Sequence, residues 1–335
     1  MNNLAISMDS DPEEREDSAF MIVDITPDRK PVLVSRKPCR SFYRDFGKIG
    51  KNLVCSGNSG LDIYEIEKTA EITLLSEFKG YGGKKIVSAS SRDLVFIMNE
   101  VQGVGIIDVA DPRSPGLLSS ICPANLSGEL VLSDVILSGN SLLLLINDLS
   151  ISGDRECILI YDISVPDKPQ LRKEVGTAPC KGYVFASRGD ALYIAGFNSF
   201  MVKNMISLEE SGESVLKKRD RMIGVAFLVD GDSAYLVEHE WALRWDTAFL
   251  NIVDLRRPEE PEFQGKTLLA INFLSDNQDI SMRKIGERLV LVSSFGLRVI
   301  DVSDPFDPCI TDLFRPSNRF RITSGLEILT VDRAY

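Results

Sequence analysis

A short motif recurs along this 335-residue chain and constrains its fold more than any other feature. It has an apolar stretch, an aspartate, one more apolar residue and a turn that usually carries two prolines. The copies with both prolines are MIVDITPDRKP (21–31), GIIDVADPRSP (105–115), LIYDISVPDKP (159–169), NIVDLRRPEEP (251–261) and VIDVSDPFDP (299–308), and DIYEIEKTAE (62–71) and MVKNMISLEE (201–210) are degraded copies. The prolines therefore mark turns and not a linker.

A second motif alternates with the first and consists of a tight turn followed by a short apolar strand. Its copies are IGKNLVCS (49–56), SSRDLVFI (90–97), SGNSLLLL (138–145), RGDALYIA (188–195), DGDSAYLV (230–237), IGERLVLV (285–292) and SGLEILTV (324–331). Glycine stands second in every copy except one, where Ser91 replaces it. Glycine, asparagine and aspartate tolerate the left-handed backbone of two-residue hairpin turns. Each repeat thus predicts four antiparallel strands over about 40–50 residues, the size of one propeller blade.

The two ends of the chain predict how the repeats close. The chain starts with a third-strand motif (21–25) and ends with a turn-and-strand unit (320–331). We therefore expect an all-β fold, a seven-bladed β-propeller of four-stranded antiparallel blades, closed by N- and C-terminal strands that share one blade. Residues 20–335 would form one domain. The acidic segment 1–19 would be a mobile lead-in.

The repeat resembles the LVIVD repeat, which forms propellers in bacterial and archaeal proteins. The segments VIDVSDPFDP and IIDVADPRSP carry this resemblance most closely, and it covers nearly the whole chain from about residue 20. Many members of that family are exported or displayed on cell surfaces, and most have no assigned activity. The resemblance therefore implies a propeller fold and supplies no catalytic residues.

Composition excludes several classes of function. The net charge of −11 argues against general affinity for nucleic acids, and no run of 18 apolar residues predicts a membrane span. The six cysteines form no CxxC pair, so we expect no zinc site, no cofactor and reduced thiols. Residues 1–19 lack a secretory signal, which favours a cytoplasmic location, with export as the alternative that the resemblance implies.

Most residues that resemble functional motifs have a structural interpretation. The repeat aspartates Asp24, Asp108, Asp162, Asp254 and Asp301 are expected to bond backbone amides in the turns that follow them. The stretch GYGGKK (80–85) is expected to connect two blades, and KKRDR (217–221) to be a solvated edge. The DGD turn (230–232) lacks the remaining spacing of a calcium loop.

The lengths of the connections suggest where a partner binds. The connections grow at 147–156, 238–246 and 268–279, and all of these would emerge on one face, formed by the B–C loops (second to third strand) and the D–A loops (between blades). The second of these segments holds the only histidine and both tryptophans, so the candidate partner-binding residues are His239, Trp241, Arg244 and Trp245. We predict a non-catalytic scaffold that binds a protein partner there. Alternatives are packing of the tryptophans on a neighbouring blade, or a hydrolase or lyase with a carboxylate and divalent-metal site at the propeller channel. Whether a small molecule binds is left open.

Overall fold

The computed structural model describes most of the chain as β-strands and turns. The described residues are 2–10, 18–26, 30–67, 71–123, 130–148, 156–177, 182–196, 199–204, 222–240, 247–257, 260–271, 280–293, 296–314 and 321–331. They divide into two compact units, residues 1–121, 279–301 and 310–335 in the first and residues 122–278 and 302–309 in the second.

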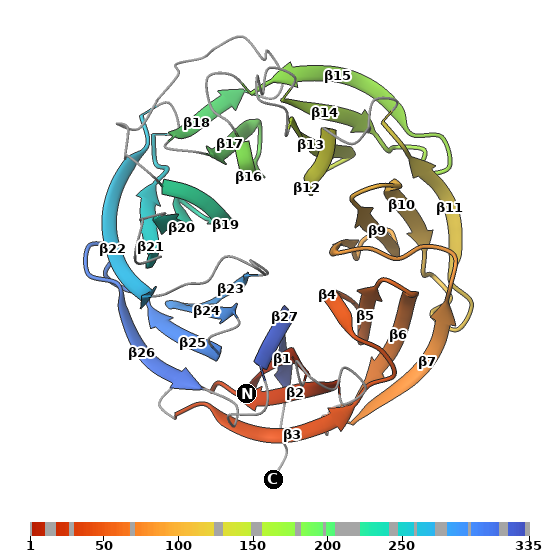
Figure 1. Ribbon diagram of the computed structural model, residues 1–335, viewed down its shortest axis with the longest axis horizontal. Coiled ribbons are helices and arrows are strands. Elements are labelled where there is room, and N and C mark those ends of the chain that lie inside the picture. Colours follow the sequence, from red (N-terminus) through yellow and green to blue (C-terminus); the bar gives the residue numbers. More distant parts are fainter. Residues whose placement is uncertain are drawn as a thin grey trace. The chain divides into compact units, whose positions relative to one another are not determined.

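In the described residues, the first unit holds four sheets, each of four strands (Figure 1). In the order of strand pairing they are β27 (Arg321–Val331), β1 (Asn2–Ser10), β2 (Ala19–Asp24) and β3 (Val32–Pro38); β4 (Tyr43–Ile49), β5 (Asn52–Gly57), β6 (Gly60–Ile66) and β7 (Ile72–Phe78); β8 (Lys85–Ala89), β9 (Leu94–Asn99), β10 (Gly103–Asp108) and β11 (Gly116–Ile121); and β23 (Ser281–Ile285), β24 (Arg288–Ser293), β25 (Gly296–Asp301) and β26 (Cys309–Phe314).

The part of the second unit that the structure describes holds three sheets (Figure 1). They are β12 (Leu130–Ser138), β13 (Ser141–Asp148), β14 (Cys157–Asp162) and β15 (Gln170–Gly176); β16 (Gly182–Arg188), β17 (Ala191–Gly196) and β18 (Ser199–Asn204); and β19 (Met222–Asp230), β20 (Ser233–Glu240), β21 (Thr247–Asp254) and β22 (Glu262–Ile271). Within the described residues, the predicted small antiparallel sheets of four strands are confirmed in six sheets, and three strands are described in the β16–β18 sheet, after which residues 205–221 lie outside the described ranges. The segment KKRDR lies outside the described residues. GYGGKK connects β7 to β8 as predicted.

The N- and C-terminal strands share one sheet, but the predicted number of strands from each end is wrong. Within the predicted mobile lead-in (1–19), residues 2–10 instead form β1, in which Leu4 pairs with Asp24 and with Leu329, whereas residues 11–17 lie outside the described residues. Residues 321–331 form a single strand, so the Ser-Gly pair at 324–325 makes no hairpin turn. Ile6 explains why β1 is ordered, because its side chain is fully buried against Phe20. The sheet therefore combines one C-terminal strand with three N-terminal strands.

The tight turns between first and second strands have the predicted backbone. The glycines at positions 50, 139, 189, 231 and 286 have φ between 54° and 58°. In the copy where Ser91 replaces glycine, Asp93 takes over the left-handed conformation, with φ of 53°. The turn there is longer, from Ala89 to Leu94, and Arg92 donates its backbone N–H to the Ala89 carbonyl. Each of these six turns thus contains one left-handed residue, whichever residue type supplies it.

The proline corners contact the last strand of the preceding sheet within each unit. The Ser76 hydroxyl on β7 donates a 2.6 Å hydrogen bond to the Pro112 carbonyl in the corner after β10. At the matching position of β22 stands Gly265, and a Cβ there would lie 2.2 Å from the Pro305 carbonyl oxygen. In the first unit, the corner after β10 therefore does more than turn the chain, because it packs the β8–β11 sheet against the β4–β7 sheet.

The core lies between sheets that face one another. Four consecutive leucines of β13, Leu142 to Leu145, are all fully buried, so both faces of this sheet are covered. The odd-numbered ones, Leu143 and Leu145, pack with Phe185 and Ile194 of the β16–β18 sheet. Complete burial of one such side chain contributes about 1.5–3 kcal/mol. Runs of consecutive apolar residues therefore have the packing that their pattern predicts.

Candidate functional site

Buried polar side chains gather at one end of the sheets. We call this the polar end, and define it as the end at which the second strand of a sheet stops and its third strand begins. Of the buried polar residues in the described ranges, those at the polar end are Ser18, Ser56, Asn147, Asp148, Thr177, Glu238, His239 and Ser293. Arg298, the third residue of β25, lies near it, whereas Asn251 lies in mid-strand and Asp134 on a first strand. Burying a polar group costs free energy unless it is hydrogen-bonded. Apolar packing therefore does not explain why these polar residues stand at the polar end.

The longer connections leave from the polar end. The bounds of the strands place residues 149–156 between β13 and β14, residues 241–246 between β20 and β21, and residues 272–280 between β22 and β23. The matching connection between β5 and β6 is only residues 58–59. The opposite end carries the glycine turns and the proline corners. Long connections on rigid strands are where binding residues concentrate in many folds.

The hairpin of β20 and β21 is held by a buried polar pair. Its ladder runs without irregularity from Ser233–Asp254 to Glu240–Thr247. Within it, Asn251 Nδ2 donates a 2.7 Å hydrogen bond to the Glu238 carboxylate, and both residues are buried. A hydrogen bond to a buried charge contributes about 1.5–3 kcal/mol. The pair therefore fixes the strand ends that carry residues 241–246.

His239 lies in this hairpin and not in a loop. It stands on β20, opposite Ile223 and Ala248, and is only 2% exposed. Its predicted place in a loop is therefore wrong, because the strand continues to Glu240 and buries the imidazole. Trp241, Arg244 and Trp245 lie outside the described residues.

The repeat aspartates bond the turns that follow them. One carboxylate oxygen of each accepts the backbone N–H two residues on, in Asp24, Asp108, Asp162 and Asp254, at 2.8–2.9 Å. Asp301 occupies the same place at the end of β25. This is the Asx-type contact that the sequence predicts.

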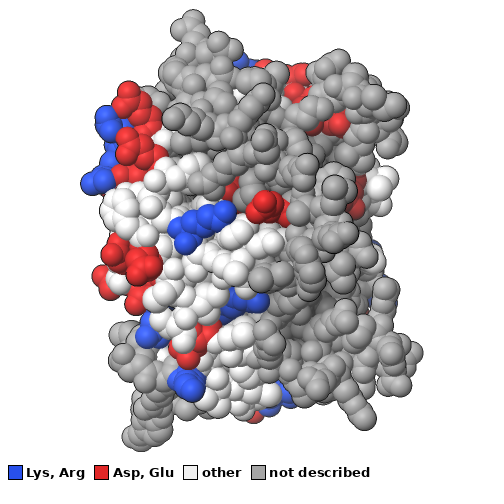
Figure 2. Space-filling view, turned by 60° about the vertical axis from the view of Figure 1, so that its left-hand side comes forward, with Lys and Arg blue, Asp and Glu red and all other residues white. Residues whose placement is uncertain are grey.

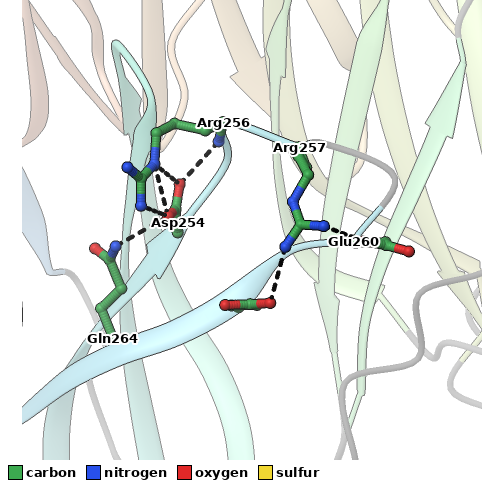
Figure 3. A network of polar contacts seen from close by, with 6 residues as sticks. Asp254, Arg256, Arg257, Glu260 and Gln264 are labelled. Atoms are coloured by element: carbon green, nitrogen blue, oxygen red, sulfur yellow. Dashed lines mark hydrogen bonds and ion pairs between the residues drawn. The ribbon is translucent and has the colours of Figure 1, made fainter.

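Arginines reinforce two of these turns. The Arg172 guanidinium donates two hydrogen bonds to Asp162 and lowers the pKa of that carboxyl to about 2. Arg256 bonds both oxygens of Asp254, which also accepts from Gln264, and the hydrogen bonds from Arg256 lower the pKa of Asp254 (Figure 3). Arg257 of the same corner pairs with Glu260 and Glu262. Described acidic and basic side chains are likewise interspersed on the face in Figure 2. The carboxylates of Asp162 and Asp254 therefore stabilise the turns that follow their strands.

An aromatic cluster lies beside Asp62 and contacts its carboxylate through Tyr43. Tyr43 donates its hydroxyl to Asp62 and lies 2.6 Å from the Tyr64 hydroxyl, and Phe20 stacks on Tyr43 with ring centroids 5.9 Å apart. Burial raises the pKa of both tyrosines, so the hydroxyls stay protonated and act as donors. Burial also raises the pKa of the nearby Cys55 thiol, which makes it unreactive. The cluster is structural.

Two carboxylates on first strands were missed by the sequence analysis. Asp45 Oδ2 accepts the Ile86 N–H at 2.8 Å, and Asp134 Oδ2 accepts the Phe185 N–H at 3.5 Å, so each links the first strands of two neighbouring sheets. Burial raises the pKa of Asp45 to about 6, although Arg283 and Lys85 counteract it. The signal in the sequence was their common place five residues before Gly50 and Gly139.

Within the described ranges, no group of three or more His, Cys, Asp or Glu side chains is arranged to hold a metal ion. No helix in the described part of the chain has the length and apolarity needed to cross a membrane.

Comparison with known proteins shows the fold and no family. No protein-family model matches the chain, and a search of curated proteins finds no match. Among solved structures, a protein from Lactobacillus plantarum is 11% identical with a TM-score of 0.69, covering 98% of this chain and 100% of its own. A hypothetical selenium-binding protein from Sulfolobus tokodaii is 11% identical with a TM-score of 0.61 (98% and 92% covered), and apo AztD from Citrobacter koseri is 10% identical with a TM-score of 0.63 (98% and 98%). Together with the small antiparallel sheets, these similarities identify a β-propeller fold.

Proposed function

We propose that this chain is a non-catalytic protein-interaction scaffold that binds a protein partner through the loops at its polar end. The observation that carries the proposal is the β20–β21 hairpin. A buried Glu238–Asn251 bond fixes its strands up to the last pair. The connection that these strands hold, residues 241–246, contains both tryptophans of the chain and Arg244. Tryptophan and arginine are the residue types most enriched in interaction hot spots.

A finer description of the scaffold belongs to the same proposal. We take the seven sheets as the blades of one ring in one domain, which the pairing of β27 with β1 would close. We take the repeat to be that of the LVIVD family, on the strength of the motif itself. We also propose a cytoplasmic location, as expected from the sequence, with export as the alternative.

Affinity capture from native lysate tests the proposal. The bait is the full chain, and the test variant is Trp241→Ala combined with Arg244→Ala. Phe306→Ala is the matched control, because Phe306 is an exposed aromatic residue in a proline corner, at the end opposite the polar end. We expect the double variant to lose the partners that the wild-type chain and the Phe306 variant retain. Equal capture by all three, with folding intact, would contradict it.

One observation favours a second function, a hydrolase or lyase with its carboxylate on a first strand. A pKa of about 6 would suit Asp45 for proton transfer near neutral pH. Its hydrogen bond to the Ile86 N–H counts against this, because it ties the carboxylate to a neighbouring strand. Divalent-metal binding that Asp45→Asn abolishes would favour the second function over the scaffold.

A further inference from the structure

Three polar residues form a row across the polar end of the β12–β15 sheet. Ile146 of β13 pairs with Cys157 of β14, which pairs with Gly176 of β15. The next positions toward the polar end are therefore Asn147, Glu156 and Thr177. The Thr177 N–H continues the ladder by donating to the Glu156 carbonyl at 3.3 Å. Side chains at adjacent positions of such a row stand about 5 Å apart.

The row faces the β16–β18 sheet. Asn147 lies two residues from Leu145, Glu156 two from Ile158, and Thr177 two from Val175. Those three apolar residues pack with Phe185, Leu192 and Ile194 of the β16–β18 sheet. Because side chains alternate along a strand, the polar row points the same way. The next residue of β17 toward the polar end on the facing side is Gly196, which has no side chain to contact the row.

The row offers oxygen acceptors in excess of donors. Asn147 is 5% exposed, and within the described residues its Oδ1 atom is buried without a hydrogen-bond partner. The fully buried Thr177 donates its hydroxyl to Glu156 Oε2 at 3.4 Å and keeps its own oxygen as an acceptor. A buried carbonyl acceptor without a donor costs about 1–3 kcal/mol, so a native fold that retains one has a use for it.

We propose that this row binds a primary ammonium group, supplied by a lysine side chain of the protein partner. The amide oxygen, the carboxylate and the hydroxyl provide three kinds of acceptor, which matches the three N–H donors of an ammonium group. The single carboxylate balances its single positive charge. A calcium ion fits less well, because it takes 6–8 oxygen ligands and usually several carboxylates. Glu156 is half-buried, which leaves the row reachable by a flexible aliphatic stem.

This proposal rests on the proposed function only in naming a protein as the source of the ammonium group. Small amines test the chemistry without a partner. The probe is n-butylammonium chloride, and n-butyltrimethylammonium chloride at the same concentration and ionic strength is the control, because it keeps the charge and lacks N–H donors. Isothermal titration calorimetry on the full chain gives the affinity, and thermal unfolding gives an independent reading.

Three variants define the expected result. Asn147→Leu and Glu156→Gln should each weaken n-butylammonium binding by at least about tenfold, the loss that one charge-assisted hydrogen bond predicts. Glu174→Gln, which removes an exposed acid from β15 of the same sheet, should bind like wild type. Asn147→Leu should unfold no earlier than wild type without amine, because it removes an unpaired buried acceptor.

Other outcomes would overturn the proposal. One is equal binding of the two ammonium probes, which would mean that charge alone is recognised. Another is unchanged n-butylammonium binding in Asn147→Leu and Glu156→Gln, and a third is no binding to the wild-type chain. Calcium stabilisation that the same two variants abolish, without amine binding, would assign the row to a metal ion instead of an ammonium group. Loss of amine binding with intact partner capture would overturn this inference alone and leave the proposed function standing.

Discussion

Asn251 and Glu238 form a hydrogen bond of 2.7 Å inside the β19–β22 sheet, where both residues are buried. They come from adjacent strands of one hairpin, and the bond lies a short distance below the connection 241–246. This bond joins the packed interior of the sheet to the segment that we propose binds a partner. Stability of the hairpin and its binding should therefore respond to the same substitutions.

The Asn251–Glu238 pair predicts unequal effects for its two partners. Asn251→Leu removes the donor and leaves a buried carboxylate, which should lower the free energy of unfolding by about 3 kcal/mol. Glu238→Gln keeps an oxygen acceptor and removes the charge, so it should cost less than about 1.5 kcal/mol. Urea unfolding of both variants measures the difference. An equal loss of unfolding free energy in the two variants would contradict a stabilising role for the Asn251–Glu238 hydrogen bond.

The raised pKa of Asp45 predicts a pH dependence of stability. Its pKa of about 6 lies above the ordinary value of 3.8, so the folded state binds this proton more tightly than the unfolded state. The resulting stabilisation is complete below pH 3.8 and is lost as pH rises through about 6. Asp45→Asn removes this titration. Wild type should thus lose about 2 kcal/mol relative to the variant between pH 4 and pH 7.

The groups that face Asp45 limit this effect. Arg283 and Lys85 favour the charged carboxylate, so Arg283→Gln should raise the pKa of Asp45 further and steepen the loss of stability. Unfolding curves recorded across the pH range check the sign. A variant Asp45→Asn that parallels wild type at every pH would contradict the assignment.

The proline corners predict a sharp contrast between two glycines in last strands. Gly265→Ala places a methyl group 2.2 Å from the Pro305 carbonyl oxygen, so the corner has to shift, at a cost of about 1–3 kcal/mol. Gly116→Ala on β11 is the matched control, because a Cβ there meets nothing within 4 Å. Thermal unfolding compares them. A Gly265 variant as stable as the Gly116 variant would mean that the corners do not pack as described.

The N-terminal strand predicts that residues near the start of the chain matter for stability. Ile6→Ala removes a fully buried side chain from the cluster around Phe20 and should cost about 2–4 kcal/mol. Val101→Ala, at an apolar residue that is 80% exposed, should change stability by less than about 0.5 kcal/mol. Chemical denaturation measures both. Equal stability of the two variants would mean that residues 2–10 do not form an ordered strand and are mobile, as the sequence suggested.

The repeats were predictable because their information is local. A left-handed turn residue and an aspartate that bonds an amide two residues away are both visible in a short window of sequence. Strand β1 was missed because its short apolar pattern is followed by the acids of residues 9–17, which read as solvated. One of its two partner strands is β27, whose Leu329 lies 325 residues along the chain from Leu4, and no local pattern reveals that pairing.

The candidate site was predictable only in part, for the same reason. Trp241 and Arg244 were found from composition within one segment. The Asn251–Glu238 bond and the row of Asn147, Glu156 and Thr177 depend on register between strands and on which face each side chain takes. His239 was predicted to lie in a loop because no local pattern shows that β20 continues to Glu240.

The most direct test of the proposed function is quantitative affinity capture with three forms of the full chain. These are wild type, the combined Trp241→Ala and Arg244→Ala variant, and Phe306→Ala, each shown to be folded by its unfolding transition. We predict that the double variant loses at least one partner by about tenfold or more, as the loss of a hot spot would produce, while Phe306→Ala captures it like wild type. Unchanged recovery of every partner by the double variant would contradict a scaffold that acts through the polar end.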